Sequence, residues 1–107
     1  MKASTIILAA FVIAAFLVAS IAAEGPWTLE PGESKSGINT WVWPRMTTVG
    51  VKNGNTTEGR LRMQAGLSPE EEDDISPMST VTYERDFGAF PLTVTNVGFT
   101  ILTIWTA

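Results

Sequence analysis

The hydrophobic pattern of the chain changes sharply after residue 23. Residues 5–23 are a run of nineteen uncharged, mostly apolar residues, preceded by Lys2 and followed by Glu24. Beyond it, apolar and polar positions alternate in segments rich in Thr, Val, Ile and Trp, which suit a pleated sheet. The pattern predicts an N-terminal apolar α-helix over residues 1–23 and a single all-β domain over residues 24–107.

About seven short strands are expected in this domain. Leu61, Met63 and Ala65 alternate with polar residues, which is typical of a half-buried antiparallel strand. Turn-forming residues at 52–55 and 96–98 predict hairpin loops. Seven short strands in a domain of this size predict a small immunoglobulin-like antiparallel β-sandwich. The expected strands cover residues 27–30, 38–43, 46–52, 59–65, 78–85, 91–95 and 99–105.

The expected last strand is apolar on both faces. Phe99, Ile101 and Trp105 would share one face, while Leu102 and Ile104 would share the other. Such a strand must be covered on both sides, either centrally in a sheet or against another subunit. The residues of the first face are therefore candidates for interaction with a protein partner or with a second copy of the chain.

Residues 1–23 admit two interpretations. Lys2, the apolar run and the small residues at its end are typical of a secretory signal peptide cleaved after Ala22 or Ala23. As a retained helix, the run would span roughly 28 Å, close to the hydrocarbon core of a bilayer. Small residues four positions apart would then allow close helix packing in a membrane or filament; they are Ala10, Ala14, Ala15 and Ala19. Both interpretations predict an extracellular, cell-surface or periplasmic domain, anchored in a membrane only if the helix is retained.

Composition excludes several classes of function. The chain has no cysteine and no histidine, which removes disulfides, thiolate chemistry and the commonest metal ligand. Its formal charge of −4 argues against binding to nucleic acid, which requires a basic surface. We find no nucleophile motif with a base and no glycine loop for phosphate. The sequence therefore predicts a protein that is not an enzyme, with no catalytic residues, metal or cofactor.

Two features suggest a small ligand-binding module as an alternative. Trp41 and Trp43 lie two positions apart, so in a strand both indoles would point to one face. There they would fill a core or contact a subunit, which the usual burial of large aromatic residues favours, or stack on a sugar. The acidic run 70–74 is expected to be a solvated loop. One helical turn beginning at Ser68, or oxygen ligands for calcium, are its alternatives.

Two resemblances bear on function. Residues 91–103 resemble the Thr-Val-x-Asn-x-Gly signature of immunoglobulin-like repeats on prokaryotic cell surfaces, which implies a non-catalytic adhesive or spacer module. An apolar helix followed by a β-sandwich resembles the architecture of archaeal pilins, which implies a self-assembling filament subunit. We therefore expect an exported structural or interaction protein that contacts a protein partner or itself.

Overall fold

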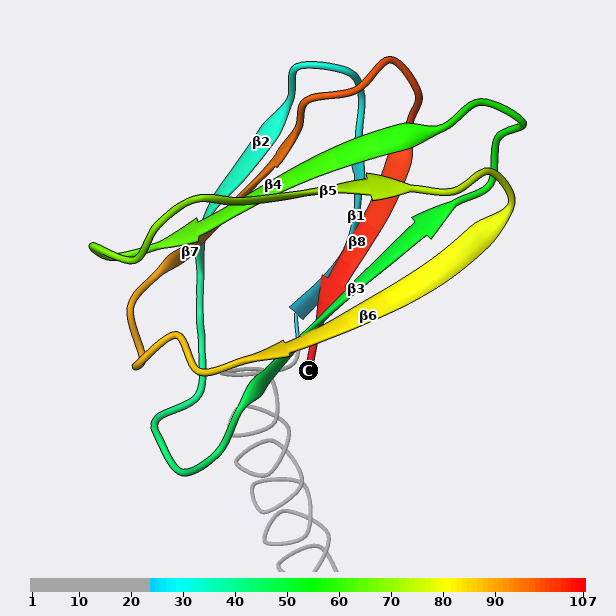
Figure 1. Cartoon of the computed structure of the whole chain (residues 1–107). Coiled ribbons are helices and arrows are strands. Elements are labelled where there is room, and N and C mark those ends of the chain that lie inside the picture. The colour runs from blue at the N-terminus through cyan, green and yellow to red at the C-terminus, as the bar shows by residue number, and fades with distance from the viewer. Residues whose placement is uncertain (1–23) are drawn as a thin grey trace, which may run out of the picture.

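The computed structural model describes residues 24–107, which form two four-stranded antiparallel sheets packed face to face (Figure 1). One sheet has the strand order β1-β8-β3-β6 and the other has the order β2-β7-β4-β5. The predicted N-terminal helix, with Ala10, Ala14, Ala15 and Ala19, lies outside the described residues. The strands are β1 (Glu24–Leu29), β2 (Ser34–Ile38), β3 (Thr47–Asn53), β4 (Gly59–Ala65), β5 (Glu71–Ile75), β6 (Ser79–Arg85), β7 (Leu92–Asn96) and β8 (Leu102–Thr106).

Successive strands mostly alternate between the two sheets. Only β4 and β5 form a hairpin within one sheet, and every other connection within residues 24–107 crosses from one sheet to the other. This is the arrangement of an eight-stranded jelly roll. The predicted all-β sandwich is confirmed in its class and its two layers. The strand count was one too low, and the immunoglobulin-like type of the sandwich is not confirmed, since the strand order, which the sequence could not fix, is that of a jelly roll.

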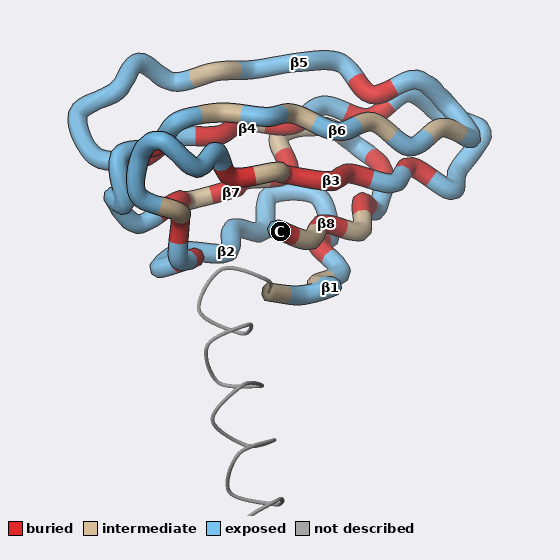
Figure 2. Tube along the Cα trace, turned by 90° about the horizontal axis from the view of Figure 1, so that it is seen from below, coloured by how far each residue is buried: buried red, intermediate tan, exposed pale blue. Residues whose placement is uncertain are grey.

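The hydrophobic core lies between the sheets, where alternate residues of the strands point inward (Figure 2). β4 has the predicted bounds and buries Leu61, Met63 and Ala65. β8 lies between β1 and β3 and buries Leu102 and Ile104, so the expected central position of this strand is confirmed. No helix within residues 24–107 is long and apolar enough to cross a membrane.

The turn sequences at 52–55 and 96–98 form corners between the sheets rather than the predicted hairpins. Asn53 and Asn96 end β3 and β7, and their side chains are fully buried. Their amides donate to four carbonyl oxygens, those of Thr57 (2.9 Å) and Ile75 (3.1 Å) for Asn53 and those of Leu29 (2.9 Å) and Thr100 (2.7 Å) for Asn96. Because buried polar groups require partners, these amides fix the corners. We call this the asparagine end, formed by loops 30–33, 54–58, 76–78 and 97–101.

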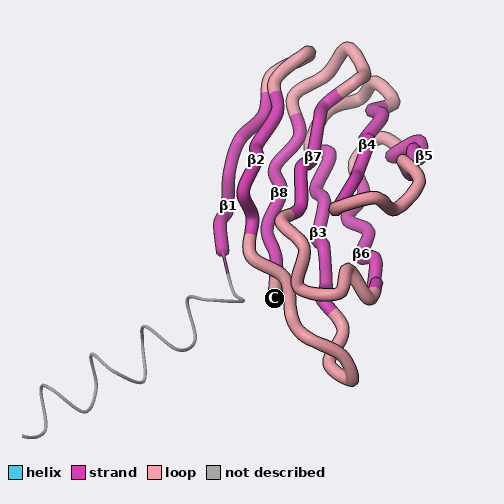
Figure 3. The backbone as a smooth tube through the Cα atoms, turned by 90° about the vertical axis from the view of Figure 1, so that its left-hand side faces the viewer, coloured by secondary structure: helices cyan, strands magenta, loops and turns pink. Residues whose placement is uncertain are grey.

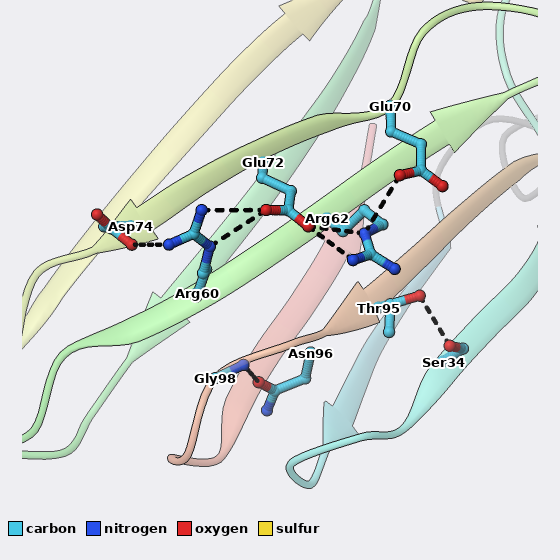
Figure 4. Close-up of polar contacts among 9 residues, drawn as sticks. All are labelled: Ser34, Arg60, Arg62, Glu70, Glu72, Asp74, Thr95, Asn96 and Gly98. Atoms are coloured by element: carbon cyan, nitrogen blue, oxygen red, sulfur yellow. Dashed lines mark hydrogen bonds and ion pairs between the residues drawn. The ribbon is translucent and has the colours of Figure 1, made fainter.

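Most of the acidic run forms a strand, β5, that the sequence analysis did not predict. β5 pairs with β4 so that Arg60 opposes Asp74 and Arg62 opposes Glu72. Both arginines donate to the Glu72 carboxylate, Arg60 at 3.0 Å and Arg62 at 2.8 Å (Figure 4). These ion pairs offset the repulsion between neighbouring carboxylates. The expected solvated loop and its helical alternative are therefore wrong for residues 71–74.

The opposite face of β5 joins the two sheets along one side of the sandwich. Glu71 forms an ion pair with Arg85 at 2.7 Å, and the Tyr83 hydroxyl donates to Asp73 at 2.6 Å. Both partners belong to β6, the edge strand of the other sheet. These polar contacts therefore link the two sheets along the side of the sandwich where the hydrophobic core ends.

Candidate functional site

Three loops and the two ends of the described chain lie together at one end of the sandwich (Figure 1). The register of the strands requires this arrangement. Glu24 opposes Thr106 and Thr47 opposes Arg85 in one sheet. In the other sheet, Leu92 opposes both Ile38 and Ala65. Loops 39–46, 66–70 and 86–91 therefore emerge in the same direction. We call this the apolar end, since five of the eight exposed large hydrophobic residues among those described lie on it.

Four apolar side chains project from two of these loops. Val42 and Trp43 are 66% and 72% exposed, and Met46 and Phe90 are 49% and 54% exposed. We call these four residues the apolar tip. Leu67, on the third loop, is fully exposed beside it. Loop 39–46 extends beyond the other loops at this end in two perpendicular views (Figures 1 and 3).

Hydrogen bonds hold the two tip loops together. The Thr40 hydroxyl donates to the carbonyl of Phe90 at 2.8 Å, and the Ala89 amide donates to the carbonyl of Trp41 at 3.3 Å. At the base of loop 39–46, the Trp41 amide donates to the Thr47 hydroxyl at 2.8 Å. The tip is therefore a joined surface of two loops rather than two independent ones.

Trp41 and Trp43 do not share the face of a strand, because β2 ends at Ile38 and both residues lie in the loop. Trp41 is half-buried, and the Arg45 guanidinium stacks on its ring at 3.7 Å from the centroid. Only Trp43 is freely exposed. The prediction of two parallel indoles is therefore wrong, although Trp43 remains an interaction candidate.

Trp105 lies on the outer face of β8, away from the apolar tip. Its indole packs against β3 directly over Gly50, where an added methyl group would lie 2.0 Å from the ring. Within residues 24–107 the indole of Trp105 is thus partly covered by its packing on β3, and no other element of the described residues is known to cover this face. Beside the indole is an open hollow of about 480 Å³, and the described residues that line it are Glu24, Gly25, Pro26, Thr103, Trp105 and Thr106.

Phe99 and Ile101 lie in a loop before β8 and not on the strand, so they do not share a face with Trp105. They are 91% and 44% exposed at the asparagine end. The structure therefore places the predicted interaction residues in three separate regions: the apolar end, the outer face of β8 and the asparagine end. The sequence analysis did not identify Met46 and Phe90, whose only signal is an apolar residue within a loop.

Arg60, Arg62 and Arg85 form ion pairs with carboxylates of the acidic run. Hydrogen bonds from Arg62 and Arg60 lower the pKa of Glu72, and the bond to Glu72 raises the pKa of Arg62. Burial, followed by the bond to Asp73, raises the pKa of Tyr83 above its ordinary range. Residues 24–107 contain no group of three or more acidic side chains arranged to hold a metal ion. The carboxylates of β5 alternate between two faces, which prevents them from converging as the calcium alternative required.

Solved structures with a similar fold are distant in sequence. The crystal structure of PirA matches with a TM-score of 0.50 and 18% identity, over 78% of this chain and 92% of that one. The C-terminal CBM6 of LamC, a marine laminarinase from Zobellia galactanivorans, matches with a TM-score of 0.52 and 10% identity, over 81% of this chain and 86% of that one. At these identities the likeness shows the shared fold alone.

Much closer relatives come from Dictyostelium discoideum. Two uncharacterized proteins of this organism are 52% and 49% identical to the chain over 83 residues. The matched stretch covers 78% of this chain and 98% of each relative. A family model, described as a family of unknown function (DUF8244), matches residues 27–107. The chain therefore belongs to the DUF8244 family through its jelly-roll domain.

Proposed function

We propose that this protein is an exported, non-catalytic interaction module that contacts its partner through the apolar tip. The observation that carries the proposal is the exposure of Val42, Trp43, Met46 and Phe90 on two loops that are hydrogen-bonded to each other. Contiguous exposed apolar surface commonly marks a contact site, whereas single exposed apolar residues do not. The arrangement favours binding over catalysis, since the tip itself contains only apolar side chains.

The tip is large enough to supply useful binding energy. Burying one large apolar side chain contributes about 1.5–3 kcal/mol. Because these four side chains are 49–72% exposed, burying their exposed parts would contribute on the order of 4–7 kcal/mol before the entropic costs of association. The bond of Thr40 to Phe90 lowers those costs, because it orders the loops before the partner arrives. A self-assembling filament subunit is the special case in which the partner is another copy of the chain.

Photo-crosslinking in the native cell fraction tests the proposal. Benzoylphenylalanine would replace Trp43 at the apolar tip or, as the matched control, Phe99 at the asparagine end. Both native side chains are aromatic and strongly exposed. We expect crosslinked adducts, to protein or lipid, from position 43 and few from position 99. Equal yields at the two positions, or none at position 43, would refute contact through the tip.

Export is supported by the sequence of residues 1–23 and is tested separately. The intact mass of the protein recovered from its native fraction distinguishes the two forms of the leader. A mass near 11.6 kDa means that the leader is retained, and a mass without the first 22 or 23 residues means that it is cleaved. Recovery of the uncleaved chain from the soluble cytoplasmic fraction would contradict both export by a cleaved signal peptide and anchoring by a retained helix.

A second candidate function is binding of a carbohydrate beside Trp105. The hollow next to its indole combines an aromatic surface with the Thr103 hydroxyl and the Glu24 carboxylate, a combination that suits a sugar ring. Titration with oligosaccharides should change tryptophan fluorescence in the native chain and in Trp43→Phe, but not in Trp105→Ala. An unchanged response in Trp105→Ala would remove this candidate.

A further inference from the structure

We propose that the partner of the apolar tip is the surface of a lipid bilayer, into which Val42, Trp43, Met46 and Phe90 insert; this inference rests on the proposed function. Three observations favour lipid over a protein groove or a second copy. They concern the shape and composition of the tip, the charge around it, and its position relative to the start of the domain.

The shape of the tip suits shallow insertion. Loop 39–46 projects beyond its neighbours, so its side chains can enter a soft surface without a complementary pocket (Figures 1 and 3). Trp43 is its most exposed member, and tryptophan is the residue that membrane interfaces enrich. Val42 and Met46 add side chains without polar groups. Insertion would therefore bury apolar area, while the indole N–H of Trp43, the one hydrogen-bond donor among these side chains, can donate to oxygens at the level of the headgroups.

The charges around the tip are compatible with lipid headgroups. Arg45 is the only charged residue in loop 39–46, and its guanidinium is held over the ring of Trp41 at the base of the tip. A cation at this level can interact with headgroup phosphates while the neighbouring apolar residues lie deeper. In loop 86–91 the only charged residue is Asp86, whose carboxylate accepts a bond from the Gly88 amide at 2.9 Å. Loop 66–70 adds one further carboxylate, that of Glu70, which forms an ion pair with Arg62 at 3.6 Å. The loops around the tip thus present one cation and two carboxylates, each of which already has a partner.

The position of the tip provides the third observation. Asn39, at the base of loop 39–46, donates to the Glu24 carboxylate at 2.6 Å. Glu24 directly follows the nineteen uncharged residues at 5–23. If those residues enter a bilayer, no linker separates them from the apolar end, so the tip must face the same surface. A domain tethered at this point meets the bilayer at a high effective concentration, so even a weak affinity of the tip for lipid would lead to its insertion.

A fluorescent probe that senses its surroundings tests this inference on the full-length chain. Because the chain contains no cysteine, one introduced thiol can be labelled with nitrobenzoxadiazole (NBD) at a chosen position. Val42→Cys places the probe in the tip and keeps Trp43, whereas Phe99→Cys places it at the asparagine end. Both variants would be mixed with vesicles of phosphatidylcholine containing a minority of phosphatidylglycerol. Circular dichroism would confirm that each variant is folded.

We expect vesicles to raise the emission of the probe at position 42 several-fold, shift it to the blue and make it sensitive to nitroxide-labelled lipid. The probe at position 99 should remain water-exposed. Adding Trp43→Ser and Phe90→Ser to Val42→Cys should remove most of the rise in emission at position 42, because two apolar side chains no longer favour insertion of the tip. Adding Ile101→Ser instead should change nothing.

Two results would overturn the inference: a water-exposed probe at position 42, or equal burial of both probes. The crosslinking experiment then separates this failure from failure of the proposed function. Adducts from position 43 to protein alone would leave the interaction module standing with a protein partner or a second copy. If position 43 also gives no adducts, both proposals fail.

Discussion

The two ends of the sandwich expose apolar residues in different structural settings. At the asparagine end, Asn53 and Asn96 are fully buried, and their amides tie the corner loops to the sheets. At the apolar end, Thr40 and Ala89 join two loops to each other, and Val42, Trp43, Met46 and Phe90 are exposed. The difference indicates that the two ends of one small domain can have different roles. Corners that maintain the fold lie at one end, and residues available for contact lie at the other.

The largest expected effect is at the asparagine end. Asn96→Ala removes two donors and leaves the carbonyls of Leu29 and Thr100 buried without them. We expect a loss of about 3 kcal/mol in the free energy of unfolding, measured by urea denaturation. Asn39→Ala is the matched control at the apolar end, since it removes an exposed amide bond and should cost less than about 0.5 kcal/mol. If the two substitutions lower the free energy of unfolding equally, the two ends do not differ in how much their side-chain amides stabilise the fold.

The sheet between the two ends provides the next test. Gly50→Ala places a methyl group where the Trp105 indole lies, so the ring must move. We expect a cost of about 1–3 kcal/mol in thermal or urea unfolding. In a Trp105→Ala background the same substitution should cost much less, because the clashing ring is absent. If Gly50→Ala lowers the free energy of unfolding equally in the native and Trp105→Ala backgrounds, the packing of Trp105 on Gly50 does not restrict this position.

Alkaline pH tests the polar side of the sandwich, which belongs to neither end. Burial and the bond to Asp73 raise the pKa of Tyr83. A raised pKa in the folded state stabilises the protein below the ordinary tyrosine pKa of about 10, and this contribution is lost as the pH rises above that value. The melting temperature should therefore fall above about pH 10. Tyr83→Phe should fall less steeply over the same range, and an identical slope would contradict the assignment.

The smallest effect on stability is expected at the apolar tip. Trp43→Ser should change the free energy of unfolding by less than about 0.5 kcal/mol, since Trp43 is 72% exposed. The same variant should reduce crosslinking and bilayer insertion, if the proposals above hold. A large loss of stability in urea would show that Trp43 supports the fold, and the contrast between the ends would then weaken.

Much of the sheet could be predicted from the alternation of side chains. β4 was predicted with its observed bounds, because Leu61, Met63 and Ala65 alternate cleanly with polar residues. β5 was missed because consecutive carboxylates predict a solvated segment. Its stability depends on Arg60 and Arg62, which reach Glu72 only once the strands pair. Local sequence cannot reveal partners that the fold brings together.

The connections and the site were harder to predict. Turns that contain Asn and Gly occur in hairpins and equally in corners, and here the buried carbonyls around Asn53 and Asn96 decide between the two. Trp41 and Trp43 suggested a strand because their spacing matches its period, but β2 ends three residues before Trp41. The joining of Phe90 to loop 39–46 depends on contacts between residues fifty positions apart. Such a surface is a property of the topology rather than of any motif.

The pairing of β1 with β8 determines when the domain can be completed. Glu24 opposes Thr106, and β8 also pairs with β3 in the middle of its sheet. While a ribosome is still synthesising the last residues, β1 and β3 have no strand between them, and this sheet cannot assemble. The chain therefore reaches its native fold only after synthesis of β8. If the protein is exported, as proposed above, this late completion keeps the chain in the unfolded state in which a narrow export channel can pass it.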